Sequence, residues 1–253
     1  MLEPYEWKRS RTVLRRERAS NRPDLADYSP LVKRMGGQVI RLSPNSTDYV
    51  NPLDINLNYS EEENPLALKS DFVLSLCEQL VGSGKLTAKE KSLIDRCTAN
   101  VYREYLSRNY AETPPTLQDF HSELLRQDEP EAHDVALAIE LFTNGSLNTF
   151  ARQTNVNPNS RIVCYDIREL GKQLLPIGML VVLDSIFNRV VSNRMKGRNT
   201  WIIIDEIYLL FQHEYSTNFL FTLWKRVRKY GTCATGLTQN VDDLLQRHTA
   251  RTM

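Results

Sequence analysis

Residues 201–206 read Trp-Ile-Ile-Ile-Asp-Glu, so a short apolar run ends in two adjacent carboxylates. A continuously apolar run of this length is typical of a strand that is covered on both faces, as in a parallel sheet between layers of helices. In such sheets, ligands bind beyond the carboxyl ends of the strands. The run therefore predicts an α/β fold with an acidic site at one edge of its sheet.

In folds that handle nucleoside triphosphates, this pattern is the Walker B arrangement. The Asp holds Mg²⁺, often through water, and the Glu polarises the attacking water. On that interpretation Asp205 is a metal-binding residue and Glu206 is a catalytic residue. Acidic residues also follow strands as turn and helix N-cap residues, so the dipeptide alone leaves both interpretations open.

The phosphate loop that usually accompanies such a pair is missing from the sequence. Its motif, GxxxxGK[ST], supplies backbone N–H groups and a Lys to the phosphates. The nearest segment ends in Gly84-Lys85, but Gln79 stands where the first Gly belongs and Leu86 stands where a hydroxyl belongs. We interpret this segment as a Gly-rich helix C-cap and turn, and we assign no residue to a phosphate loop.

Composition excludes several classes of protein. The 32 basic and 31 acidic residues leave a net charge of +1, so any contact with DNA requires a local patch. Cys77, Cys97 and Cys164 lie in apolar segments and, with Cys233, form no CxxC pair. This indicates reduced, buried thiols in a cytosolic protein rather than a zinc site. No apolar run approaches the roughly 18 residues of a membrane span.

Changes in charge composition and in the alternation of predicted helices and strands divide the chain into an N-terminal arm, a core and an insertion. The N-terminal region is rich in Arg and has few apolar positions, which favours a solvated, poorly ordered basic arm over a basic arm that contacts nucleic acid. Helices without intervening strands follow the first part of the core, which predicts an inserted subdomain. The regions are residues 1–26, a basic atypical N-terminal arm; 27–60, part of the core; 61–150, an all-α insertion lobe; and 151–253, the rest of the core.

The insertion lobe carries its own helix start signals. A capping side chain before a Pro marks one start, since Pro is favoured at the first helical position. A hydroxyl residue followed three positions later by a carboxylate marks two others as capping boxes. These signals are Asn64 with Pro65, Thr87 with Glu90, and Thr116 with Asp119.

The core alternates strands with helices, which is the signature of a parallel sheet with crossover helices. A short helix followed by a strand, within residues 31–42, adds one further helix–strand unit to the core. We predict strands over residues 38–42, 161–167, 200–204 and 231–238, and helices over residues 176–196 and 217–229.

Two further groups are candidates for the site. Gln239 follows the last predicted strand, where its amide could contact a terminal phosphate and the attacking water, or could simply be a polar strand end. Arg226 and Arg228 belong to a group of four cations near the end of the preceding helix. Such a group is favourable near a helix C-terminus, and the alternatives are an arginine finger or a DNA contact.

Four segments resemble the conjugative-transfer and type IV secretion ATPases, in the HerA-FtsK group of RecA-like hexameric motors. They are residues 31–40 (Leu-Val-Lys-Arg-Met-Gly-Gly-Gln-Val-Ile), 49–56 (Tyr-Val-Asn-Pro-Leu-Asp-Ile-Asn), the strand at 201–206, and 230–245, which contains Tyr-Gly-Thr and Leu-Thr-Gln-Asn-Val-Asp-Asp-Leu-Leu.

The resemblance implies a RecA-like, mostly parallel sheet flanked by helices, with the all-α insertion, in a chain truncated at both ends. It implies ATP and Mg²⁺ as cofactors, with Asp205 on the metal, Glu206 as catalytic base and Gln239 as sensor. It also implies a hexameric homo-oligomer at the cytoplasmic face of the cell membrane, with channel components, a coupling protein and DNA as partners. ATP hydrolysis would then drive pilus assembly or the transfer of DNA or protein.

Two alternatives stay open at this point. The chain could be a non-catalytic remnant or interaction module that joins full-length subunits. It could also be part of a DNA-translocating coupling protein or HerA-like ATPase. An intact phosphate loop would distinguish the first alternative from an active motor.

Overall fold

The fold is that of a computed structural model, which describes residues 9–15, 28–55, 64–82, 84–110, 113–157, 160–212, 214–227, 229–238 and 241. The chain forms two compact units. The sheet unit consists of Met1–Ile40, Asn157–Asp166 and Arg189–Met253, and the helical unit consists of Arg41–Val156 and Ile167–Asn188.

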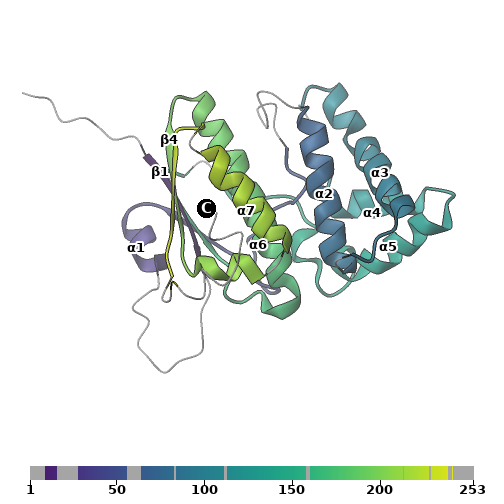
Figure 1. Cartoon of the computed structure of the whole chain (residues 1–253), viewed down its shortest axis with the longest axis horizontal. Helices are drawn as coiled ribbons and strands as arrows, with labels where there is room; N and C mark the ends of the chain where they lie inside the picture. The colour runs from purple at the N-terminus through teal and green to yellow at the C-terminus, as the bar shows by residue number, and fades with distance from the viewer. Residues whose placement is uncertain are drawn as a thin grey trace, which may run out of the picture. The chain divides into compact units, whose positions relative to one another are not determined.

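Within its described residues, the sheet unit holds a five-stranded sheet in the order β2-β3-β1-β4-β5. Figure 1 labels two neighbouring strands of this sheet, β1 and β4. β1 runs parallel to both β3 and β4, and β4 runs parallel to β5. The predicted α/β class with a parallel sheet is therefore confirmed. The strands are β1 (Arg9–Arg15), β2 (Gln38–Arg41), β3 (Ile162–Asp166), β4 (Asn199–Ile204) and β5 (Thr232–Gly236).

β1 is a central strand, although sequence analysis predicts a solvated arm in this region. In the register of the sheet, Val13 pairs with Cys164 on one side and with Ile203 on the other. The Thr-Val-Leu sequence within β1 suits a strand because β-branched residues pack well on a pleated surface. The prediction of a solvated arm is wrong for β1, because the surrounding Arg residues conceal this short run. The rest of residues 1–26 lies outside the described residues.

A short helix, α1 (Tyr28–Arg34), packs beside the sheet. Val32 forms a buried cluster with Ile162 and Cys164 of β3. The turn after α1 needs a glycine, because a Cβ at Gly37 would lie 2.8 Å from the Cβ of Ile162. Gly37 thus lets the step from α1 to β2 approach β3 closely. The remaining helices of the sheet unit are η2 (Ile207–Gln212) and α7 (Glu214–Val227).

The helical unit is built around four helices that pack on one another (Figure 1). The three predicted helix starts are confirmed: Asn64 accepts a hydrogen bond from Leu66, and both Thr87 and Thr116 form capping boxes. The helices are α2 (Pro65–Val81), α3 (Ala88–Ser107), α4 (Leu117–Leu125) and α5 (Pro130–Thr143), with the short η1 (Asn148–Phe150) after them.

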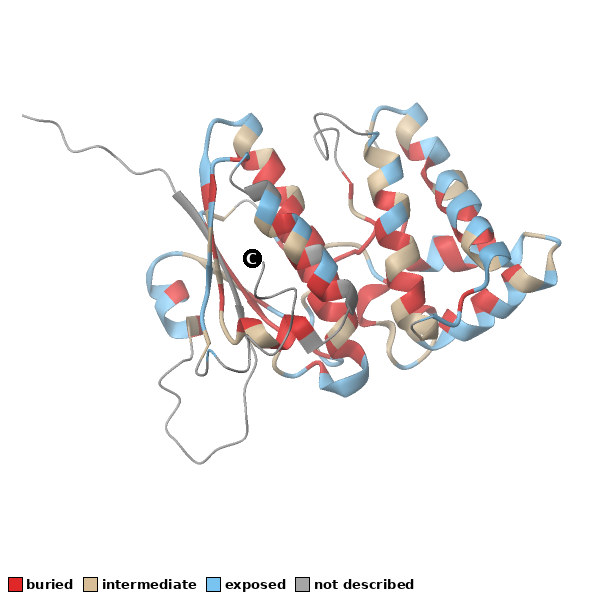
Figure 2. Ribbon diagram, viewed as in Figure 1, coloured by how far each residue is buried: buried red, intermediate tan, exposed pale blue. Residues whose placement is uncertain are grey.

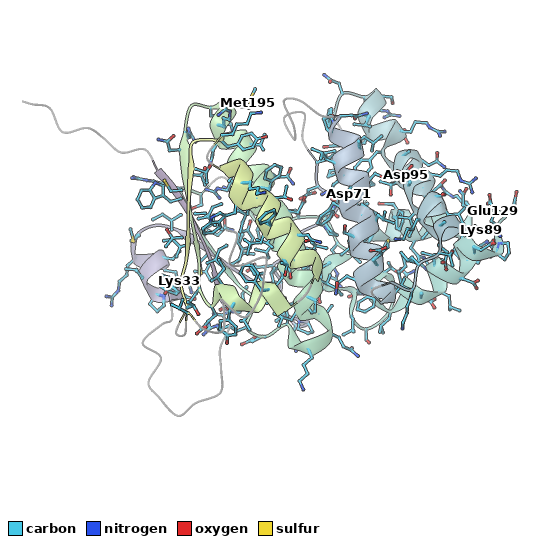
Figure 3. All side chains as sticks on the ribbon, viewed as in Figure 1. Lys33, Asp71, Lys89, Asp95, Glu129 and Met195 are labelled. Atoms are coloured by element: carbon cyan, nitrogen blue, oxygen red, sulfur yellow. The ribbon has the colours of Figure 1, made fainter. Side chains whose placement is uncertain are left out.

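Ion pairs and polar contacts join these helices on the outside. Arg96 of α3 contacts Glu129 at 2.6 Å, and Lys89 contacts Glu131 at 2.9 Å. Figure 3 shows the labelled Lys89 and Glu129 at the same end of these helices. Exposed pairs of this kind add little stability, at most about 1 kcal/mol each, so burial of the apolar faces must hold the four helices together.

The longest helix, α6 (Gly171–Met195), begins earlier than predicted. We expected its start near Pro176, but Pro176 lies inside the helix. Leu174 and Leu175 are buried in the added turn, and this burial offsets the hydrogen bond that Pro cannot donate. Among the described helices, only α6 is long and apolar enough to cross a bilayer, and 83% of its most apolar window is buried (Figure 2). That burial is typical of a core helix.

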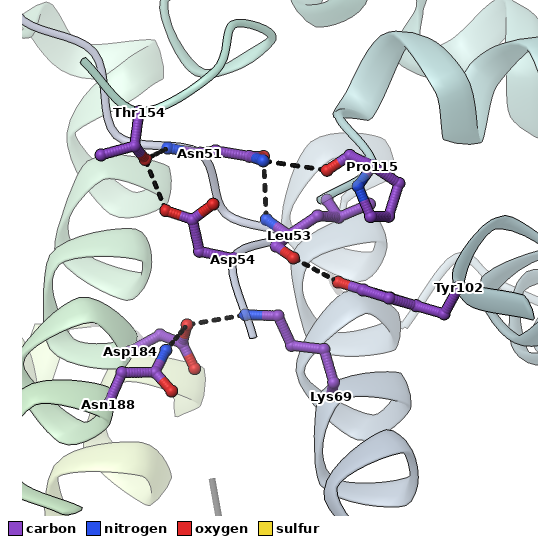
Figure 4. A network of polar contacts seen from close by, with 9 residues as sticks. All are labelled: Asn51, Leu53, Asp54, Lys69, Tyr102, Pro115, Thr154, Asp184 and Asn188. Carbon is purple, nitrogen blue, oxygen red and sulfur yellow. Dashed lines mark hydrogen bonds and ion pairs between the residues drawn. The ribbon is translucent and has the colours of Figure 1, made fainter. Parts of the chain in front are cut away.

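Two segments that lie far apart in the sequence are joined by hydrogen bonds in the helical unit. Tyr49 donates its N–H to the Asn155 side chain at 2.8 Å, and Asn51 donates its N–H to the Thr154 hydroxyl at 2.8 Å. The Asn51 amide also reaches the carbonyl of Pro115 at 2.9 Å (Figure 4). Residues 49–51, part of a segment singled out in the sequence, therefore tie the start of the helical unit to residues 154–155.

A buried ion pair lies close to this junction. Lys69 of α2 contacts Asp184 of α6 at 2.7 Å, and the two side chains are 0% and 3% exposed (Figure 4). The Asp184 carboxylate also accepts a hydrogen bond from Asn188 at 3.2 Å, and Lys69 lies 4.4 Å from the centre of the Phe72 ring. Asp54, whose carboxylate accepts from Thr154, interacts electrostatically with both members of the pair.

Candidate functional site

Asp205 and Glu206 directly follow β4, at the carboxyl end of the parallel sheet. Ile202 and Ile204 are buried on one face of β4, and Ile203 is half-buried on the other face. β4 lies between β1 and β5, so the two carboxylates follow an interior strand of the described sheet. The burial of Ile202 and Ile204 and the pairing of β4 along both edges fix the backbone that carries the carboxylate pair.

Glu206 adopts a backbone conformation that is unfavourable for its residue type. Its φ is +51°, in the left-handed region that normally favours glycine. This conformation costs roughly 1–2 kcal/mol for an L-residue with a side chain. It persists only where the surrounding structure determines it, which happens most often at functional sites. The N–H of Glu206 donates to the Asp205 carboxylate at 3.1 Å, which ties the two residues to each other.

Leu237, just beyond β5, forms hydrogen bonds on both sides of the carboxylate pair. Its N–H donates to the carbonyl of Ile204 at 2.8 Å, and its carbonyl accepts from the N–H of Ile207 at 3.0 Å. The carbonyl of Glu206 accepts from Leu209 at 2.9 Å, at the start of η2. The end of β5 is therefore directly bonded to the turn that holds Asp205 and Glu206. Sequence analysis missed this role of Leu237, because it depends on pairing between two strands.

The other predicted site residues are only partly covered by the structure. Gln239 and Arg228 lie outside the described residues, and Arg226 belongs to α7 but its side chain is not described. The register pairs Ile204 with Gly236. The end of β5, three residues before Gln239, therefore lies beside the end of β4, which Asp205 and Glu206 follow. The roles of these three residues stay predictions.

The two carboxylates suit a hard cation such as Mg²⁺. Mg²⁺ is usually held by one or two carboxylates together with water and substrate phosphates, rather than by a full set of protein ligands. In the part of the chain that the structure describes, no group of three or more His, Cys, Asp or Glu side chains could hold a metal ion. A cation at Asp205 would fit this mode of binding, with water and phosphate as further ligands.

The segment nearest to a phosphate loop is a helix end, as predicted. Gly82 is the C-cap of α2, with a φ of +117° and its N–H donating to the carbonyl of Glu78. A phosphate loop instead follows a strand and opens a helix, so that its N–H groups point at the phosphates. Gly82 and its neighbours therefore do not fit a nucleotide phosphate.

Comparisons with known proteins agree with this architecture. Residues 73–252, more than half of the chain, match the family model described as the TraG P-loop domain. A search of curated proteins found no match.

Among solved structures, VirB4 of Thermoanaerobacter pseudethanolicus is similar with a TM-score of 0.74 and 21% identity, over 93% of this chain and 64% of that chain. This likeness confirms the predicted RecA-like fold, and the chain spans less than two thirds of VirB4. The bacterial conjugative coupling protein TrwB aligns at a TM-score of 0.35 and 14% identity, over 97% of this chain and 68% of that chain. From the family match, and as its resemblance to the conjugative-transfer ATPases predicts, the chain belongs to the TraG P-loop domain family.

Proposed function

We propose that the chain supplies the metal-binding and water-activating side of an ATPase site in a conjugation or type IV secretion motor. The observation that carries this proposal is the Asp205-Glu206 pair at the carboxyl end of β4, held by Leu237 in a member of a P-loop family. Carboxylates fixed directly after an interior strand suit catalysis better than carboxylates farther out on a loop, because their positions vary less.

Each carboxylate has a separate role in this proposal. Asp205 holds Mg²⁺, directly or through water, and Mg²⁺ when bound offsets the negative charge of the phosphate oxygens. Glu206 accepts a hydrogen bond from the attacking water and takes up its proton. Its unusual backbone conformation supports this assignment, because strained residues gather at active sites.

Gln239 and the two arginines would complete the site. Gln239 would orient the attacking water and respond to the terminal phosphate. Arg226 and Arg228 would reach the phosphates of a neighbouring subunit as arginine fingers, or would contact DNA. We assign no residue of the chain to the phosphate cradle, since the sequence contains no GxxxxGK[ST] motif.

The same proposal extends to the assembly. The motor would be a homo-hexamer at the cytoplasmic face of the cell membrane, where it would contact secretion-channel components and a coupling protein. ATP hydrolysis there would drive pilus assembly or the transfer of DNA or protein. The family match supports such partners in general terms.

The test uses two forms of the protein. We expect the 253-residue chain to hydrolyse ATP negligibly, because each missing phosphate hydrogen bond forfeits roughly 1.5–3 kcal/mol. We expect turnover when residues 1–26, which include β1, are replaced by a strand and GxxxxGK[ST] loop from a family member. In this second form, Glu206→Gln should abolish turnover and leave binding of fluorescent ATP intact. Asp205→Asn should weaken the Mg²⁺-dependent part of binding.

Asp128→Asn is the matched control, because Asp128 is an exposed carboxylate of the helical unit. It should change neither turnover nor binding. A loss of binding in Glu206→Gln as large as its loss of turnover would assign Glu206 a structural role. A loss of binding in Asp205→Asn that does not depend on Mg²⁺ would do the same for Asp205. The two outcomes together would favour the alternative of a non-catalytic interaction module.

A further inference from the structure

Gly236, the last residue of β5, lies against the side chain that follows the carboxylate pair. A Cβ added at Gly236 would lie 2.6 Å from Cδ1, 3.0 Å from Cγ2 and 3.3 Å from Cβ of Ile207. Cδ1 is the flexible end of the side chain and could rotate away. Cγ2 and Cβ cannot, because their positions are set by the backbone of Ile207 and by its stiff, β-branched χ1. Any side chain at position 236 would therefore push on the backbone of Ile207.

Space, rather than backbone conformation, makes glycine necessary at this position. Gly236 is not among the glycines with a positive φ. Ile207 itself is only 5% exposed, so its side chain has little room to move in the other direction. In closely packed interiors even one added methyl group is resisted. The contact between Gly236 and Ile207 therefore sets the distance between the end of β5 and the start of η2.

The contact between Gly236 and Ile207 lies next to Glu206, the residue with the unfavourable backbone conformation. Ile207 follows Glu206, whose φ of +51° must be maintained by its surroundings. The two hydrogen bonds of Leu237, to Ile204 at 2.8 Å and from Ile207 at 3.0 Å, enclose Asp205 and Glu206. The second bond requires Leu237 and Ile207 to approach as closely as they do. Displacing Ile207 would lengthen the second bond and release Glu206 from its conformation.

We propose that Gly236 is a positioning residue, which holds Glu206 in its left-handed conformation through the side chain of Ile207 and the backbone of Leu237. The meaning of this role rests on the proposed function, in which Glu206 acts on water and Asp205 on the metal. Gly236 itself contacts no reacting atom. Because Gly236 has no side chain, β5 can approach Ile207 closely, and this approach fixes the positions of the Asp205 and Glu206 carboxylates.

The first part of the test measures the conformation of Glu206 by NMR in the full chain. A left-handed residue gives characteristic Cα and Cβ shifts and a strong intraresidue contact between its amide and α protons. We expect Gly236→Ala to remove this signature and Gly236→Ala with Ile207→Ala to restore it, because the second change removes Cδ1 and Cγ2. Thr235→Ala, at the exposed preceding position of β5, is the control and should leave the signature unchanged.

The second part measures cation binding, with Mn²⁺ as a paramagnetic probe for Mg²⁺. Mn²⁺ should broaden the amide signals of residues 205–207, and Asp205→Asn should abolish the effect. In Gly236→Ala we expect roughly tenfold weaker Mn²⁺ binding, or about 1.4 kcal/mol, with recovery in the double variant. A change confined to packing would alter stability and leave this affinity unchanged.

Each outcome decides one of the two claims. The inference is overturned if Gly236→Ala keeps the signature of Glu206, if Ile207→Ala does not restore it, or if the conformation changes while Mn²⁺ binding does not. If the unaltered chain shows no Mn²⁺ effect that depends on Asp205, the proposed metal role fails. The NMR signature then still decides whether Gly236 fixes the conformation of Glu206.

Discussion

Removing the buried cation at Lys69 should destabilise the helical unit strongly. Lys69→Met keeps most of the side-chain volume but leaves the Asp184 carboxylate buried without its ion-pair partner at 2.7 Å. Breaking a buried pair from one side costs about 3–5 kcal/mol. The hydrogen bond from Asn188 remains, so we expect the lower end of that range, about 3 kcal/mol.

Replacing both partners should cost much less. In Lys69→Met with Asp184→Leu neither member of the ion pair is left charged without the other, and apolar replacements of buried pairs are often neutral or stabilising. We expect stability to return to within about 1 kcal/mol of the unaltered chain. Lys89→Met is the matched control, because Lys89 is 79% exposed in its pair with Glu131. It should change stability by no more than about 0.5 kcal/mol.

Urea unfolding can assign the effect to one unit. Of the three tryptophans, Trp7 lies outside the described residues, and Trp201 and Trp224 belong to the sheet unit, whereas α2 to α5 belong to the helical unit. With a slope of about 2 kcal/mol per molar, Lys69→Met should lower the urea midpoint seen by circular dichroism by about 1.5 M. Tryptophan fluorescence should shift less. A loss below about 1 kcal/mol, or a double variant no better than the single one, would refute the reasoning.

Three further expectations follow from local features. Burial raises the pKa of the Asp54 carboxyl above its ordinary value of 3.8, so ionisation disfavours the folded state and stability falls as pH rises from about 3.8 through the folded-state pKa. Asp54→Asn should remove this part of the loss, as urea midpoints measured from about pH 3.5 to pH 7 would show. Thr87→Ala deletes a capping box and should cost about 1 kcal/mol by the same assay. Burial raises the pKa of the Cys97 thiol to about 11 and Cys233 is exposed, so mass spectrometry after brief alkylation near neutral pH should find Cys233 modified first.

Features that depend on neighbouring residues could be predicted from the sequence. The helix caps at Asn64, Thr87 and Thr116 were found because a cap and its partner lie only two or three residues apart. β4 could be predicted because a strand that is covered on both faces has a continuously apolar sequence, as residues 201–204 do. The position of Asp205 and Glu206 after β4 follows from the same local pattern.

Features that depend on distant residues could not be predicted in this way. β1 was missed because its partners come from β3 and β4, far along the chain, and its Arg-rich surroundings obscure a strand pattern. Lys69 and Asp184 are 115 residues apart, and each alone looks like a solvated charge. The strained φ of Glu206 and its link to Leu237 likewise arise from packing between strands.

The central place of β1 has a consequence for how the chain folds. Its partners on β3 and β4 are synthesised roughly 150 residues or more after it, once the segment from Arg41 to Val156 has been made. Closing such a long loop is entropically costly, so pairing of this kind is slow. Until β1 pairs with them, the facing edges of β3 and β4 are open to other strands, including those of neighbouring nascent chains. Assembly of the sheet, rather than of the helices, should therefore limit the yield of folded protein.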